Sequence, residues 1–374
     1  MPPLAQRNLL YDKVRLAVTV TGIVFAVVLI VVELGLFVGF TSTTSSLIDN
    51  SGADLWVTST HVPYIEMGVP FSERKLYQVK AVPGVADAEK YIVRFSQWKR
   101  PDGQQESVQV VGINPDKPFG RPWNMVLGSV GDLKTPDAVI VDEVYKNKLG
   151  VSRLGEVFEI NGHRARVVGF TRGIRAFTTS PYVFTTFKNA QDYGRLPADQ
   201  TTYVLVKTAP GANREQVRQE IRARVKDVDV LTGREFSRMT QAYWMFTTGA
   251  GVAVLLAALL GLVVGFVVVA QTIYATTMDH LREFGTLKAM GAPNRYVYNV
   301  IIQQAAISAV IGYVLGMAVS VFIVRASQHG GAAILLPWPL AVGIFFLTLL
   351  MCVGAALVSI NKVTRLDPAM VFKG

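Results

Sequence analysis

The segment Val18–Phe40, VTVTGIVFAVVLIVVELGLFVGF, is apolar except for a few hydroxyl side chains and one acid, Glu33. An α-helix of this length crosses about 30 Å of hydrocarbon, the thickness of a bilayer core. Three further apolar stretches follow in the last third of the chain, at 244–273, 300–324 and 340–360. The pattern predicts a membrane protein with four transmembrane α-helices.

Residues 41–243, between the first and second apolar stretches, alternate strand and helix signals. Asn161-Gly162 lies between two apolar runs and predicts a β-hairpin, and Asn213 is expected to cap a helix between two strands. This β-α-β unit resembles half of a ferredoxin-like split domain. We expect an α+β extracytoplasmic domain inserted between helices 1 and 2, with a β-rich insert near 116–200.

Charge sets the expected orientation. The chain has a net charge of +10, but residues 41–240 hold 27 Lys and Arg against 22 Asp and Glu, with no basic run, which argues against nucleic-acid binding.

The other basic residues flank the membrane ends, so the positive-inside rule places both termini and the loop 274–299 in the cytoplasm and the large domain outside. The first stretch is too long for a signal peptide and is expected to remain as an anchor.

The remaining segments are short. Residues 1–17 have near-helical apolar spacing and predict an amphipathic helix at the cytoplasmic surface, or merely a polar helix start. The segment 325–339 is the expected outer loop, and 361–374 the expected cytoplasmic tail. Tyr243, Trp244 and Trp338 are most simply interfacial anchors at outer helix ends.

No motif for catalysis or nucleotide binding is present. The chain contains no Gly-Lys dipeptide, hence no phosphate-binding loop, and neither H-E-x-x-H nor G-x-S-x-G. Its four histidines are far apart in sequence, and its one cysteine, Cys352, lies in the fourth apolar stretch. We therefore expect no catalytic residue, no metal site and no cofactor bound by this chain; ATP and Mg would be held by a separate ATPase.

Small residues and one acid mark the apolar stretches. GxxxG spacings predict close helix packing, with the first-stretch pair available for another subunit. The carboxylate of Glu33 lies within an apolar helix, where a charge is costly, and Arg325 is its natural counter-charge. Three roles are open for Glu33: a structural partner of Arg325, a ligand or gating residue, or a side chain that reaches the headgroups. The three glycine pairs are Gly35 with Gly39, Gly261 with Gly265, and Gly312 with Gly316.

The cytoplasmic segment Met278–Pro293, MDHLREFGTLKAMGAP, is the most specific part of the chain. It has acids in its first turns and Gly291 and Pro293 as stop signals, so it predicts a short helix. Its apolar face, formed by Leu281, Phe284 and Leu287, would contact a partner protein or lipid headgroups.

The run REFGTLKAMGA within this segment strongly resembles the signature of MacB/FtsX-like ABC transporter permeases, the type VII exporter class. Leu9–Gly39, Gly52–Trp56 and Leu366–Met370 resemble the DevC-like branch of that class. The resemblance extends over essentially the whole chain and is weakest across 116–200.

The resemblance implies a homodimeric permease of the cell inner membrane, driven by a separate ABC ATPase through mechanotransmission. It implies a periplasmic adaptor and an outer-membrane channel as further partners, and export of an amphiphilic or hydrophobic substrate. The alternative is an FtsX-like transmembrane regulator that activates an envelope partner without transporting cargo. The residues on the ATPase-docking motif are Arg282, Glu283, Gly285, Leu287, Lys288 and Gly291.

Overall fold

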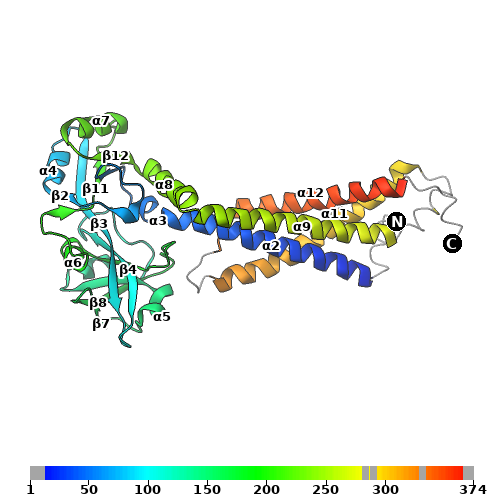
Figure 1. Ribbon diagram of the computed structural model, residues 1–374, viewed down its shortest axis with the longest axis horizontal. Coiled ribbons are helices and arrows are strands. Elements are labelled where there is room, and N and C mark those ends of the chain that lie inside the picture. The colour runs from blue at the N-terminus through cyan, green and yellow to red at the C-terminus, as the bar shows by residue number, and fades with distance from the viewer. Residues whose placement is uncertain (1–12, 280–285, 287–292, 328–333, 365–374) are drawn as a thin grey trace. The chain divides into compact units, whose positions relative to one another are not determined.

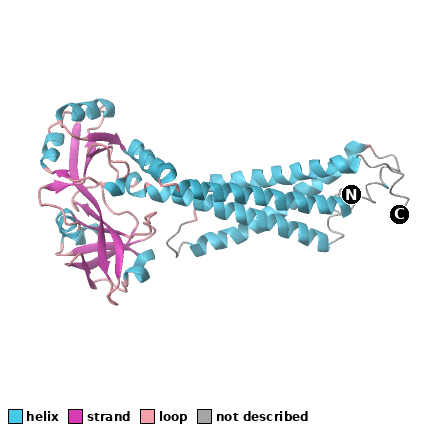
Figure 2. Cartoon of the chain, viewed as in Figure 1, coloured by secondary structure: helices cyan, strands magenta, loops and turns pink. Residues whose placement is uncertain are grey.

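The computed structural model describes residues 13–279, 286, 293–327 and 334–364. The chain divides into two compact units. The helical unit contains residues 1–39, 253–327 and 334–374, and the α+β unit contains 40–252 and 328–333. Figure 2 shows that the strands belong to the α+β unit.

Among the described residues, four long apolar helices form the helical unit (Figure 1). Each is long and apolar enough to cross a membrane, which confirms the predicted four-helix class. Their bounds are α2 Lys13–Thr44, α9 Ala250–Asp279, α11 Asn294–Ser327 and α12 Trp338–Thr364.

One boundary differs from the sequence-based expectation. The apolar stretch expected to begin at Trp244 is interrupted, since Tyr243–Thr247 forms a separate π-helix, η4, and Gly249 has φ +74°. A left-handed residue cannot continue an α-helix, so α9 starts only at Ala250. The predicted amphipathic segment is described only from Lys13 onward, where it is the beginning of α2.

Four strands of the α+β unit form an antiparallel sheet in the order β12-β1-β11-β3. Helix α4 lies between β1 and β3 in the chain, and α7 lies between β11 and β12. These are the two β-α-β halves of a ferredoxin-like split domain. The expected helix cap is confirmed, because Asn213 Oδ1 accepts from the backbone N–H groups of Glu215 and Gln216. The bounds are β1 Leu55–Thr58, α4 Arg74–Lys80, β3 Val85–Lys99, β11 Tyr203–Thr208, α7 Arg214–Arg224 and β12 Asp229–Thr232.

Both faces of this sheet are covered. Leu55 and Val57 of β1 pack beneath α4 and α7, whereas the intervening Trp56 faces the opposite side. Trp56 is fully buried and makes ring contacts with Tyr91, Tyr203 and Phe236. Phe236 belongs to α8, Gly233–Ala242, so this helix is held to the sheet by its aromatic side chain.

A second group of strands closes into a barrel. Following the pairings from β3 through β4, β9, β6, β8 and β7 leads back to β3, because Trp98 pairs with Ile160. The barrel strands are β4 Gln105–Ile113, β6 Ala138–Asp142, β7 Val157–Ile160, β8 His163–Thr171 and β9 Tyr182–Thr186.

Inward side chains from all six barrel strands form one buried cluster, which includes Trp98, Val110, Val139 and Val167. The Asn161-Gly162 hairpin is confirmed as the turn between β7 and β8. The 15-residue strand β3 enters both the split sheet and the barrel. The barrel therefore takes in residues from Ile92 onward, upstream of the insert expected near 116–200.

The shorter elements complete the α+β unit. They are α3 Ser46–Asp49, η1 Ile65–Met67, β2 Phe71–Ser72, β5 Met125–Leu127, η2 Val130–Lys134, η3 Glu143–Tyr145, α5 Lys146–Leu149, α6 Phe187–Tyr193 and β10 Gln200–Thr201.

Candidate functional site

The predicted ATPase-docking residues lie outside the described part of the chain. Only Thr286 is described within 280–292, after α9 ends at Asp279 and before α11 begins at Asn294. The docking assignment therefore stays a prediction. Its residues are Leu281, Arg282, Glu283, Phe284, Gly285, Leu287, Lys288 and Gly291.

Glu33 lies half-buried on α2, and a Cβ added at Gly261 of α9 would come within 2.9 Å of its Cγ. Arg325 is exposed near the end of α11. Within the described residues no ion pair joins these two side chains. Their pairing in the membrane stays a prediction.

The glycine pairs of α9 and α11 face α2 from two sides. A Cβ at Gly265 would lie 3.2 Å from Ile30 Cδ1, and one at Gly316 would lie 2.8 Å from Val27 Cβ. Gly312 faces Ile23 in the same way. Close backbone approach at small residues is how helices pack where both lipid and protein are apolar.

The first glycine of the α2 pair, Gly35, has a packing partner within the same chain. Gly35 faces Ile334 and Leu335, and its carbonyl oxygen accepts from the Leu335 N–H at 3.0 Å. Gly35 therefore packs inside the helical unit.

The α+β unit is connected to the apolar stretches by two chain segments, 40–49 and 233–247, which we call the stalk. Gln241 of α8 donates from Nε2 to the Thr41 carbonyl at 3.2 Å and to Ser45 Oγ at 2.8 Å. Ser45 Oγ in turn donates to Asp49 at 2.7 Å. The two segments are thus joined by hydrogen bonds just outside the apolar stretches.

Five aromatic rings pack together at the π-helix η4, and we call them the aromatic cluster. Two of them belong to η4 itself, Tyr243 and Trp244, and the other three are Phe40, Tyr64 and Phe177. Tyr64 stacks on Tyr243 with centroids 4.1 Å apart, and Phe177 contacts both Phe40 at 4.3 Å and Trp244 at 5.1 Å. Phe177 comes from the segment between β8 and β9. The cluster therefore joins the end of α2, the barrel and η4.

Tyr243 and Trp244, expected as interfacial anchors, are half-buried and pack on Tyr64 and Phe177 within the α+β unit. Their place at the membrane interface stays a prediction. Trp338, at the start of α12, is 77% exposed.

A buried acid lies beside the cluster. Glu66 of η1 is only 6% exposed, and its Oε2 accepts from Trp244 Nε1 at 3.4 Å. Burial raises the pKa of the Glu66 carboxyl to about 7, and the bond from Trp244 opposes this only in part. Among the described residues no cation pairs with Glu66.

Sequence analysis did not identify Glu66 or Phe177. One local signal could have separated Trp244 from the apolar helix. Gly249 adopts a left-handed backbone conformation, which ends the helical path between Trp244 and α9. Nothing local distinguishes a buried glutamate in a loop from an exposed one.

The described residues contain no group of three His, Cys, Asp or Glu side chains that could hold a metal ion. The residues that the structure brings together in the stalk and the aromatic cluster make packing contacts and hydrogen bonds.

Comparison with known families identifies the class. The MacB-like periplasmic core domain matches residues 16–224, and the FtsX-like permease C-terminal domain matches residues 240–368. The chain therefore belongs to the MacB/FtsX-like family of ABC transporter permeases. It is a multi-pass membrane protein whose α+β domain lies between its first and second apolar helices.

Individual relatives extend along the whole chain. An uncharacterised ABC transporter permease of Mycobacterium tuberculosis is 25% identical and covers 99% of both chains, as does one of Mycobacterium bovis. A third, from Methanocaldococcus jannaschii, is 20% identical over 59% of this chain and 58% of its own.

Two solved structures are also similar. The periplasmic region of MacB from Actinobacillus actinomycetemcomitans has a TM-score of 0.38 and 10% identity, covering 50% of this chain and 92% of that one. The extracellular domain of the noncanonic ABC-type transporter YknZ from Gram-positive bacteria has a TM-score of 0.36 and 15% identity, covering 48% and 99%.

Proposed function

We propose that this permease works as a homodimer that converts ATP hydrolysis by a separate ABC ATPase into movement of its α+β domain. The movement drives export of an amphiphilic or hydrophobic substrate. The chain itself catalyses no bond chemistry, and ATP and Mg are held by the partner ATPase.

The observation that carries this proposal is the construction of the stalk. Gln241 connects α8 to the end of α2, and Phe177 connects the barrel to the same helix end. A shift of α2 or of the chain entering α9 therefore displaces the split sheet and the barrel together. The π-helix η4 and Gly249 supply a place where the second stalk segment can bend.

The proposed partners lie on both sides of the membrane, because ATP hydrolysis on the cytoplasmic side is coupled to movement of the α+β domain on the outer side. The ATPase binds the cytoplasmic segment 274–299, and both termini lie on the same side of the inner membrane. A periplasmic adaptor and an outer-membrane channel receive the substrate on the outer side. The lipid bilayer supplies the surroundings of the four helices.

Docking is tested by co-purifying the permease with its ATPase in nanodiscs and measuring ATP hydrolysis. Leu287→Asp places a charge on the apolar face of the predicted docking helix and should abolish complex formation. Arg295→Gln, at the beginning of α11 and outside the motif, is the control and should leave the complex intact. A Leu287→Asp complex that forms and hydrolyses normally would disprove the docking assignment.

Transmission is tested by cross-linking the stalk. Ser45→Cys combined with Gln241→Cys, joined by a short thiol cross-linker, should prevent the two segments from separating and slow hydrolysis several-fold. Lys99→Cys with Glu159→Cys places the same cross-link between paired strands of the barrel and should have no effect. Unchanged hydrolysis in the stalk-linked protein would rule out transmission through this contact.

A further inference from the structure

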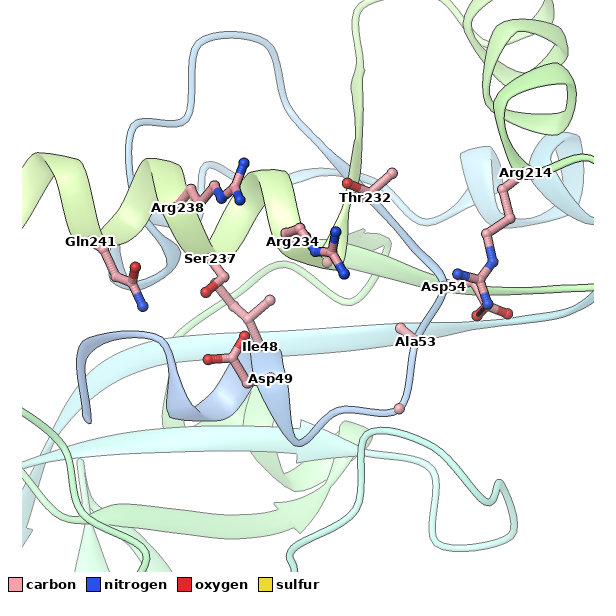
Figure 3. A pocket seen from close by; sticks show the side chains of 12 residues that line it. Ile48, Asp49, Ala53, Asp54, Arg214, Thr232, Arg234, Ser237, Arg238 and Gln241 are labelled. Atoms are coloured by element: carbon pink, nitrogen blue, oxygen red, sulfur yellow. Dashed lines mark ion pairs between the residues drawn. The ribbon is translucent and has the colours of Figure 1, made fainter. Parts of the chain in front are cut away.

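A polar pocket of about 680 Å³ lies within the α+β unit, between α3, the segment 52–54 and the beginning of α8. Figure 3 shows Arg234 and Arg238 projecting from successive turns of α8 and Arg214 extending to Asp54. Three of the side chains that line it are arginines.

The acids of the pocket already have partners. Asp54 forms an ion pair with Arg214 at 3.0 Å and another with Lys207 at 3.5 Å, and it accepts from the Thr208 N–H at 3.0 Å. Asp49 accepts from Ser45 Oγ. Ser45 is a neutral donor, so Asp49 keeps its charge at the pocket edge, but among the described residues neither carboxylate forms an ion pair with Arg234 or Arg238.

Arg234 and Arg238 are exposed, and neither forms an ion pair or hydrogen bond with any described residue. Their neighbours on α7 differ. Arg218 pairs with Glu235 at 2.8 Å, and Arg224 pairs with Glu220 at 3.1 Å. Arg234 and Arg238 therefore differ from these arginines in lacking an acidic partner among the described residues.

The position of these arginines is electrostatically unfavourable without a ligand. Arg234 is the second residue of α8, where the helix dipole favours an anion. Arg238 follows at i+4, where like charges repel on a helix surface. An anion bound between them removes both penalties.

We propose that this pocket binds a phosphate group, carried by a membrane phospholipid or by a small phosphate compound. Guanidinium groups present paired N–H donors in a planar fork that matches phosphate oxygens, and the N-terminus of α8 adds a favourable field. The inference concerns a ligand site and does not depend on the proposed transport function.

The test uses the full chain in nanodiscs of zwitterionic lipid and a fluorescent, water-soluble lysophosphatidic acid as the probe. Binding should saturate and weaken as salt is added, since the contact is ionic. Arg234→Gln with Arg238→Gln should weaken binding at least tenfold, and Arg234→Lys with Arg238→Lys should restore part of it. Arg224→Gln, an exposed arginine outside the pocket, should change binding less than twofold.

Competition distinguishes the two sources of phosphate. Displacement of the probe by inorganic phosphate at millimolar concentration supports a small phosphate compound. Displacement only by nanodiscs that contain phosphatidylglycerol supports a lipid headgroup. Wild-type protein that does not bind the probe, or a double glutamine variant that retains its melting temperature and binds equally well, would refute the site.

Discussion

Replacing Glu66 with glutamine should stabilise the α+β unit at alkaline pH. The pKa of this carboxyl is raised from 4.5 to about 7 because the side chain is buried. The folded protein therefore holds the proton more tightly than the unfolded chain does, and stability falls as pH rises from about 4.5 to about 7. The loss is nearly complete by about pH 8, one unit above the folded pKa.

The size of the effect follows from the same shift. A difference of one pKa unit corresponds to about 1.4 kcal/mol, so ionised Glu66 costs the folded state ~3 kcal/mol, most of it developing between pH 5 and 8. Glutamine stays neutral and can still accept from Trp244 Nε1. For a unit of this size, that free energy corresponds to a rise in melting temperature of roughly 6 to 12 °C at pH 8 and a much smaller rise at pH 5.

Thermal unfolding of the full chain, followed by tryptophan fluorescence at both pH values, measures this difference. Glu159→Gln is the matched control, because the Glu159 side chain is 46% exposed and forms only a surface ion pair with Lys99. A Glu66→Gln protein that melts lower than wild type at pH 8, or whose change in melting temperature is the same at pH 5 and pH 8, would refute the reasoning.

Three further predictions concern orientation and helix packing. A cysteine at Asn161 should react with a membrane-impermeant thiol reagent added from outside the cell, and protection would reverse the expected orientation. Gly312→Ala should lower thermal stability by about 1 to 3 kcal/mol because its Cβ would overlap Ile23, whereas Gly343→Ala meets no atom within 4 Å and should be tolerated; equal melting temperatures would contradict this packing. If Glu33 and Arg325 pair in the membrane, each glutamine variant should lower stability and the double variant should regain part of it; additive losses would rule out the pair.

Local signals in the sequence were sufficient for the elements whose geometry depends on neighbouring residues. Asn161-Gly162 requires left-handed backbone at both positions, and the structure has φ +49° and +89° there. Gly150 ends α5 with φ +70°, as a left-handed cap should. These positions depend on backbone conformation over a few residues, which the residue types alone restrict.

Contacts between distant segments could not be predicted in this way. Closure of the barrel depends on Trp98 pairing with Ile160 and on β4 pairing with β9, and no local pattern specifies either register. An aromatic residue at the end of an apolar stretch has the same sequence pattern whether it faces lipid or packs on a protein surface. The contacts of Trp244 with Phe177 and Glu66 could therefore not be predicted from its position in the sequence.

Three departures from local rules lie in or beside the second stalk segment and the aromatic cluster. η4 is a π-helix, Gly249 interrupts the chain before α9, and Glu66 is a buried acid without a cation among the described residues. Each of these features lowers stability compared with a continuous helix and an apolar core. A protein that needed only a rigid connection would gain from replacing all three. Under the proposed function, their presence together beside the aromatic cluster fits a segment that bends during each transport cycle.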